Sequence, residues 1–237
     1  TAFHLDPQER KRIAFPLEIA PDAPAGEREG KIRLSFLGTT LEAPFRVNVS
    51  EAPREPRAMP LDLAPHANFD AVAFEANRTD YTQSMGMFCY PADFTPSDRV
   101  VNLYGAPFRM LSLEDGRKNV VLPQGQKIEV PPGAWRAVAF LGYGHDGKHP
   151  GAWTFHYSDG TAQAVDSQIP EWCTPPPDGF HVAFTAPYRY IANGPAGPPC
   201  ELFLWSLPLD PSKTLTRIEF PQMKHAYIFA ATLLPAE

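Results

Sequence analysis

The sequence lacks a long uninterrupted apolar segment and lacks an excess of positive charge. None of its apolar runs reaches the roughly 18 to 20 residues that a membrane-spanning helix needs. Its 21 lysines and arginines stand against 27 aspartates and glutamates, a formal net charge of −6, whereas nucleic-acid-binding proteins present basic surfaces. We therefore expect neither a membrane partner nor a nucleic-acid partner. No signal peptide is recognisable, and a first residue of Thr1 instead of Met fits a processed or excised piece.

Cysteine is scarce, and its count is odd. Cys89, Cys173 and Cys200 allow at most one internal disulfide. Cys173 and Cys200 flank the same loop-rich region and are the pair that a disulfide would join. Three buried, reduced thiols are an alternative that the sequence favours no less.

The sequence also lacks the common catalytic and cofactor motifs, namely G-x-S-x-G, H-E-x-x-H, the P-loop and the dinucleotide fingerprint. Asp166 and Glu171 could form an acid pair, but glycoside hydrolysis needs two carboxyl groups roughly 5–10 Å apart across a cleft. Asp159 is better explained as a turn residue than as a ligand contact.

Metal-ligand residue types occur together in one segment, from His145 to His149. Its glycine and its place between two predicted strands favour a surface loop over a metal site. No D-x-D-x-D loop marks a calcium site either. We expect no cofactor, with a structural calcium ion left open.

Proline, in contrast, is abundant at 28 of 237 residues, which is more than twice its usual share. The prolines interrupt short apolar runs in which apolar and polar residues alternate, as in half-buried strands. Such runs cover residues 13–19, 32–36 and 41–49, and about ten more follow after residue 60. The sequence therefore predicts an all-β fold, an antiparallel β-sandwich of the jelly-roll type.

The clearest hairpin spans residues 153–166. Trp153, Phe155 and Tyr157 alternate, and Asp159-Gly160 suits a two-residue type I′ turn. That turn would place Trp153 opposite Asp166, with the large side chains facing Ala162 and Ala164.

Residues 22–26, Asp-Ala-Pro-Ala-Gly, and the strand ending in Val47-Asn48-Val49 resemble the closing half of immunoglobulin-like domains of bacterial glycosidases. Such domains have several more strands upstream. The resemblance therefore implies a partner, an upstream domain or another chain, that completes the sheet.

A second resemblance covers most of residues 61–237. Its features, in chain order, are Phe88–Ala92, Tyr104–Phe108, Val130–Gly133, Tyr157–Thr161, Glu171-Trp172 and two closing apolar strands. This order is similar to that of galactose-binding-like modules attached to secreted bacterial carbohydrate-active enzymes. It implies a jelly roll, a glycan partner or a supporting role beside a catalytic domain, and a secreted or extracytoplasmic location.

Aromatic residues next to predicted turns are the candidate ligand contacts, because sugar rings stack on aromatic faces while polar neighbours bind hydroxyl groups. Their alternative is a place in the core. The candidate residues are Tyr143, His145, Trp172, Asp178, Tyr188, Arg189 and Tyr190.

The sequence thus predicts a partial immunoglobulin-like domain over residues 1–50, a charged, proline-rich linker over 51–60 and a galactose-binding-like domain over 61–237. The favoured function is a non-catalytic carbohydrate-recognition module of a larger secreted glycoside hydrolase. A structural spacer that binds no sugar is the first alternative, and an autonomous glycan hydrolase is the second.

Overall fold

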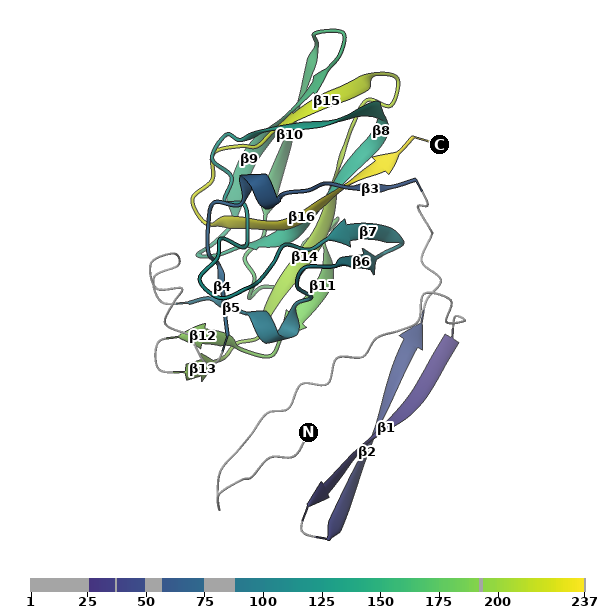
Figure 1. Cartoon of the computed structure of the whole chain (residues 1–237), viewed down its shortest axis with the longest axis vertical. Helices are drawn as coiled ribbons and strands as arrows, with labels where there is room; N and C mark the ends of the chain where they lie inside the picture. Colours follow the sequence, from purple (N-terminus) through teal and green to yellow (C-terminus); the bar gives the residue numbers. More distant parts are fainter. Residues whose placement is uncertain (1–25, 37, 50–56, 75–87, 192–193, 237) are drawn as a thin grey trace. The chain divides into compact units, whose positions relative to one another are not determined.

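The computed structural model describes residues 26–36, 38–49, 57–74, 88–191 and 194–236. The chain divides into two compact units, residues 1–54 and 55–237 (Figure 1). In the described part, no helix is long and apolar enough to cross a membrane. Two predicted segments lie outside the described residues. They are the strand over residues 13–19 and the first part of the linker, residues 51–56.

The described residues of the first unit form one antiparallel hairpin. Strands β1 (Gly26–Phe36) and β2 (Thr39–Val49) include two of the predicted apolar runs. Their register alternates charged pairs such as Glu29↔Arg46 with apolar pairs such as Leu34↔Leu41. The hairpin therefore has one charged face and one apolar face, and Leu34 and Leu41 are 42% and 64% exposed.

The second unit is built almost entirely of strands. Helical segments of its described residues are the short 3-10 turns η1 (Ala64–His66) and η3 (Ala92–Phe94). The strands are β3 (Met59–Pro60), β4 (Val72–Ala73), β5 (Tyr90–Pro91), β6 (Val100–Leu103), β7 (Ala106–Arg109), β8 (Lys127–Gly144), β9 (His149–Tyr157), β10 (Ala162–Ile169), β11 (His181–Ala186), β12 (Arg189–Ile191), β13 (Gly194–Ala196), β14 (Cys200–Pro208), β15 (Thr214–Glu219) and β16 (Ala226–Pro235).

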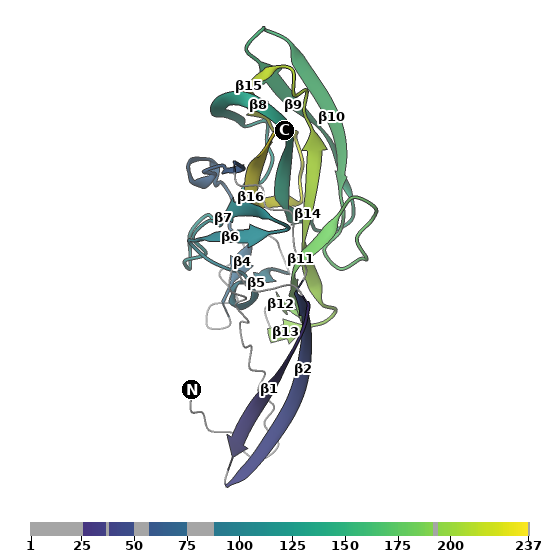
Figure 2. The ribbon, with the colours of Figure 1, turned by 90° about the vertical axis from the view of Figure 1, so that its right-hand side faces the viewer.

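Strand β8 is the centre of this unit. The main sheet runs β10-β9-β15-β8-β14-β11, and β16 pairs with β8 and β3. The first part of β8 pairs with β15, and its second part lies between β14 and β16. Seen edge-on in Figure 2, β6, β7 and β16 lie on one side of the unit, and β9, β10, β11 and β14 lie on the other. The expected all-β sandwich is confirmed.

The core lies around β8 and β16. Residues 137–144 of β8 and 226–234 of β16 are buried without interruption, which is the pattern of strands covered on both faces. The largest fully buried side chains include Trp153, Phe140 and Tyr227. The prolines at positions 131 and 132 do not end the strand, so two predicted runs, 127–130 and 135–143, belong to one strand.

The hairpin over residues 153–166 is present, but its register differs from the prediction by one residue. Trp153 lies opposite Val165, and Phe155 lies opposite Gln163. The loop has three residues: Tyr157 N–H donates to Thr161 O (3.0 Å), and Gly160 N–H donates to Tyr157 O (3.1 Å). Because a one-residue shift moves side chains to the other face, Ala162 and Ala164 face outward, away from the large rings.

The apolar run at 119–122 is not a regular strand. Val120 and Val121 instead make isolated bridges to Phe69 and Ile228. The buried Asn119 accepts a hydrogen bond from Ala71 N–H at 2.9 Å, so its side chain replaces a backbone pairing. This segment is therefore held in the core without joining a sheet.

Candidate functional site

A short loop packs across one end of β8 and brings several predicted site residues together. Gly144, the last residue of β8, donates its N–H to Pro170 O (2.8 Å) and accepts from Trp172 N–H (2.9 Å). Trp172 O in turn accepts from Glu201 N–H of β14 (2.8 Å). These bonds fix Trp172 and its neighbours against the ends of β8 and β14.

Two of the predicted ligand contacts form a buried aromatic wall at this end. Trp172 stacks on Tyr143 with ring centroids 4.8 Å apart and planes 15° apart, and both side chains are fully buried. Burial raises the pKa of the Tyr143 hydroxyl well above its ordinary value. Both rings therefore occupy the core, which matches the alternative interpretation of their sequence pattern.

Tyr188 and Tyr190 also face inward. Tyr190 donates its hydroxyl to Asp93 Oδ2 at 2.9 Å, and its backbone pairs with Cys89. Tyr188 packs edge-on against Phe94, with ring centroids 5.4 Å apart. The interpretation of these rings as surface contacts is wrong, because both side chains are buried and contact residues of η3, Tyr188 at Phe94 and Tyr190 at Asp93.

Arg189 and His145 are the partly exposed members of this group, and with three neighbours they form a closed set of contacts. We call it the Arg189 ring: Phe88, His145, Trp172, Cys173 and Arg189. Arg189 Cζ lies 4.0 Å from the Phe88 ring centroid, and Arg189 Nη1 lies 3.5 Å from Cys173 Sγ. The His145 ring lies 5.8 Å from that of Phe88 and 5.2 Å from that of Trp172, centroid to centroid.

The electrostatics of the Arg189 ring are unusual. Burial, with the nearby His225 as a second cause, lowers the pKa of His145 to about 4, so its imidazole is neutral at neutral pH. Arg189 has no carboxylate within ion-pair distance among the described residues. Arg189 Nε and Trp172 Nε1 are buried and have no hydrogen-bond acceptor in the described part of the chain.

The His145–His149 segment is a turn, as its composition predicts. His149 Nε2 lies 2.7 Å from His145 O, and His225 Nδ1 lies 3.8 Å from Asp146 Oδ2. Within the described ranges, no group of three or more histidine, cysteine, aspartate or glutamate residues is arranged to hold a metal ion.

All three cysteines are free thiols, and Cys89 and Cys200 are buried. This outcome matches the alternative of three reduced thiols, so the Cys173–Cys200 pair is not formed. Burial raises the pKa of Cys173 above its ordinary value despite the nearby Arg189, so the thiol form predominates at neutral pH.

The two candidate acids lie on different elements. Asp166 is on β10 opposite Ala152, on the outward face, while Glu171 accepts a hydrogen bond from Gly147 N–H at 3.0 Å. Asp159 Oδ1 accepts from both Thr161 N (2.9 Å) and Thr161 Oγ1 (2.6 Å), which is the turn role that its position predicts.

An exposed aromatic residue that the sequence analysis did not name as a ligand contact lies at the tip of the β6–β7 hairpin. Tyr104 and Gly105 form its two-residue turn, with φ values of +49° and +85°, so Tyr104 adopts a left-handed conformation that bulky residues rarely occupy. Its ring is 55% exposed and packs beside His181, with centroids 5.0 Å apart. Its hydroxyl donates to Val182 O at 3.2 Å.

Asp178 lies on the turn directly before His181. Phe180 N–H donates to Pro177 O (3.1 Å) and closes this turn, which leaves Asp178 exposed. We call Tyr104, His181 and the turn at 177–180 the Tyr104 platform. For Tyr104, the signal in the sequence was the Tyr104-Gly105 pair between two short apolar runs. Such a pair predicts a hairpin turn but not the exposure of its first residue.

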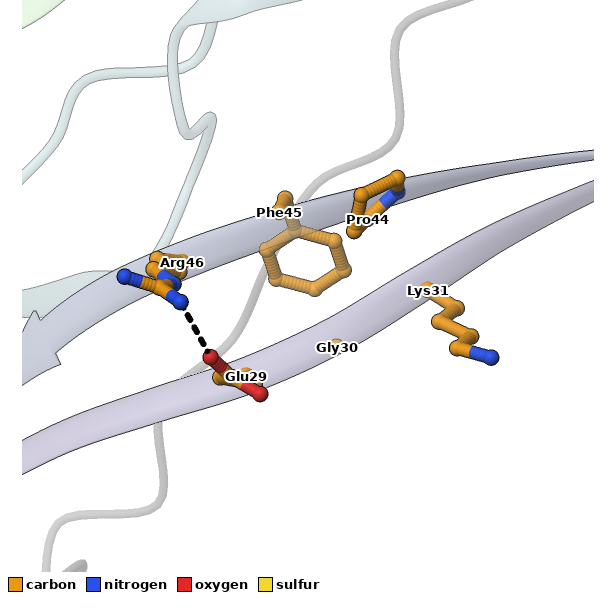
Figure 3. A pocket seen from close by; sticks show the side chains of 6 residues that line it. All are labelled: Glu29, Gly30, Lys31, Pro44, Phe45 and Arg46. Atoms are coloured by element: carbon orange, nitrogen blue, oxygen red, sulfur yellow. Dashed lines mark ion pairs between the residues drawn. The ribbon is translucent and has the colours of Figure 1, made fainter.

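The first unit has a shallow groove of its own, lined by Glu29, Gly30, Lys31, Pro44, Phe45 and Arg46 (Figure 3). The Phe45 ring lies over Gly30 so closely that a Cβ at position 30 would overlap it. Arg46 Nη2 pairs with Glu29 Oε1 at 2.8 Å beside the ring. The aromatic ring covers the glycine of the opposite strand, a common way to stabilise a two-stranded ribbon.

The family model for the AziU2-like beta-sandwich domain matches residues 57–237. The chain belongs to this family. A comparison with curated proteins finds no significant match.

The AziU2-like domain corresponds closely to the second structural unit, which begins at residue 55. The Arg189 ring and the Tyr104 platform both lie within it, whereas the β1–β2 hairpin lies outside it. The match supports the β-sandwich fold, while the finer galactose-binding-like identity stays a prediction.

Proposed function

We propose that the AziU2-like domain of this chain is a non-catalytic carbohydrate-recognition module and that the Tyr104 platform is its sugar-binding surface. The observation that carries this proposal is the exposed Tyr104 ring, held in a strained backbone conformation at the tip of a hairpin. Strain of this kind costs free energy and persists where the surrounding structure enforces it, often at ligand sites.

The platform has the groups that sugar recognition needs. One apolar face of a pyranose ring can stack on Tyr104, and the Asp178 carboxylate and His181 imidazole can bind its hydroxyl groups. The Tyr104 hydroxyl bond to Val182 O fixes the ring orientation before binding, which lowers the entropy lost on association. An aromatic contact contributes about 0.5–1.5 kcal/mol beyond its buried area, so we expect dissociation constants in the micromolar to millimolar range.

The decisive experiment is a glycan-array screen of the full chain, followed by calorimetry on each hit. Tyr104→Asn should abolish binding because the ring is lost. It should change the free energy of unfolding by no more than about 1 kcal/mol, because asparagine is favoured in this turn. Val100→Ala, at a 50% exposed position of the same hairpin, is the matched control and should bind normally. A folded chain with no hit, or a Tyr104→Asn variant that binds normally, would refute the proposal.

The second candidate is a structural spacer, and the apolar face of the β1–β2 hairpin favours it. Leu34 and Leu41 are exposed there, as expected of a surface that another domain covers. An upstream domain or chain that completes the immunoglobulin-like sheet is the proposed partner. Leu41→Ser should weaken attachment of that partner and leave glycan binding by the Tyr104 platform unchanged.

Membership in a larger glycoside hydrolase and a secreted location are also proposals, and they rest on the sequence resemblance. Fusion or co-purification of the chain with a catalytic domain that acts on the glycan found in the array would support them.

A further inference from the structure

We propose that the Arg189 ring is a second binding site, separate from the Tyr104 platform, and that it binds the carboxylate group of a small ligand. The two sites are associated with opposite ends of β11, because His181 begins that strand and Arg189 follows shortly after its last residue, Ala186.

The first argument is the charge of Arg189. Its guanidinium lies over the Phe88 ring with Cζ 4.0 Å from the ring centroid, and the acceptor it has among the described residues is the Cys173 thiol. A thiol is a weak acceptor and carries no compensating charge in its protonated form. A partly buried cation that makes no ion pair among the described residues is unfavourable, and a directly bound anionic ligand would reduce that penalty.

The second argument is the pair of unsatisfied donors. Arg189 Nε and the fully buried Trp172 Nε1 belong to the same closed set of contacts, and neither has an acceptor in the part of the chain that is described. Buried N–H groups are nearly always paired, so we expect an oxygen acceptor here that the described residues do not supply. A water molecule could satisfy one donor, but it carries no charge to pair with the guanidinium.

The third argument concerns the kind of anion. The planar guanidinium lies over the Phe88 ring, and a guanidinium presents its donors in a fork that matches a carboxylate. His145 is neutral at neutral pH, so Arg189 is the single full positive charge of the ring. Glu171 and Glu201 both act electrostatically on the adjacent Cys173. These carboxylates disfavour a doubly charged phosphate more than a singly charged carboxylate.

The test is a titration of the full chain at pH 7 and constant ionic strength, with acetate, inorganic phosphate and chloride as separate probes. Thermal unfolding and amide NMR shifts are the readouts. We expect acetate to raise the melting temperature and to shift the amide signals around residues 172–173 and 189, with phosphate and chloride at least threefold less effective. Arg189→Gln should weaken acetate binding at least tenfold, and Arg189→Lys should weaken it less.

Arg109→Gln, at an exposed arginine on β7, is the matched control and should respond to acetate like the wild type. Should Arg189→Gln fail to fold, acetate binding by Arg189→Lys and by His145→Gln is compared with that of the wild type instead. No acetate response in the wild type, an undiminished response in Arg189→Gln, or an equal response to phosphate would each overturn the proposal. Tyr104→Asn should keep the acetate response, so a failure of sugar binding and a failure of carboxylate binding are distinguishable.

Discussion

Gly144 is the residue that allows the loop at 170–174 to pack onto β8. A Cβ at this position would lie 2.8 Å from His149 Cδ2, 2.8 Å from Pro170 O and 3.2 Å from Gly147 O. Because two of these atoms belong to the backbone, the conflict cannot be relieved by a side-chain rotation alone. Gly144→Ala should lower the free energy of unfolding by about 1–3 kcal/mol, measured as a shift of the urea midpoint. Gly197→Ala, where an added Cβ meets no atom within 4 Å, should cost little; equal effects would contradict the packing argument.

His145 makes the stability of the chain depend on pH. Its pKa in the folded state is about 4, chiefly because of burial, whereas an unfolded histidine titrates near 6.5. Between these values the unfolded chain binds the proton more tightly, so stability falls as the pH is lowered from about 6.5 to 4. Water screens part of the penalty at this partly exposed side chain, and we expect a loss of about 1–2 kcal/mol.

The measurement is the urea midpoint between pH 4 and 7. His145→Gln should flatten the fall of the midpoint between about pH 6.5 and 4. An unchanged profile in the variant would show that His145 is not the source of the pH dependence.

Residue types near turns predicted which side chains would gather but not which would be exposed. Tyr143, Trp172 and Tyr190 are next to chain reversals, yet the loop at 170–174 and the pairing of residues 89 and 190 cover them. Both contacts join segments far apart in the sequence, so no local pattern reveals them. Tyr104 is exposed for the opposite reason, since a two-residue turn offers its first side chain no cover.

At the level of elements, the turn between β9 and β10 depends on a left-handed residue. Gly160 has a φ of +81°, and an added Cβ would meet no atom within 4 Å. Gly160→Ala should therefore cost about 1 kcal/mol through the backbone alone, seen as a lower melting temperature. Gly160→Asn should cost less, because asparagine tolerates this conformation; a larger loss with asparagine would show that side-chain contacts matter.

The elements themselves were largely predictable, and their register was not. The runs at 181–186, 202–207 and 226–234 fall within β11, β14 and β16, because short apolar runs bounded by turns are a strong strand signal. The register of the β9–β10 hairpin was predicted wrongly because a two-residue loop was assumed. Tyr157 and Thr161 instead enclose three residues. Loop length sets register, and the Asp-Gly pair fits either length.

At the scale of the whole molecule, the division into two units predicts that residues 55–237 fold alone. The family match and the buried core both lie inside this range. A fragment of residues 55–237 should unfold in a single transition with the melting temperature of the full chain. A peptide of residues 26–49 should show little structure by circular dichroism, because an isolated hairpin is marginally stable in water. A fragment that melts well below the full chain would show that the first unit supports the second.

The end of the predicted linker was misplaced, because Met59–Pro60 form β3 and pair with β16, and the sequence could not supply a function. Composition excludes classes of partner, whereas a binding site depends on distances between residues such as Phe88, Trp172 and Arg189, which meet only in the folded chain.

The dual pairing of β8 has a consequence for hydrogen exchange. Residues 137–142 of its second part are buried and paired with β14 on one side and β16 on the other. Opening any amide there disrupts two ladders at once, so these protons should exchange only through global unfolding. The amides of β10, at the edge of the same sheet, should exchange through local fraying. Slow protons in β8 would therefore report the stability of the whole domain, whichever of its sites a ligand occupies.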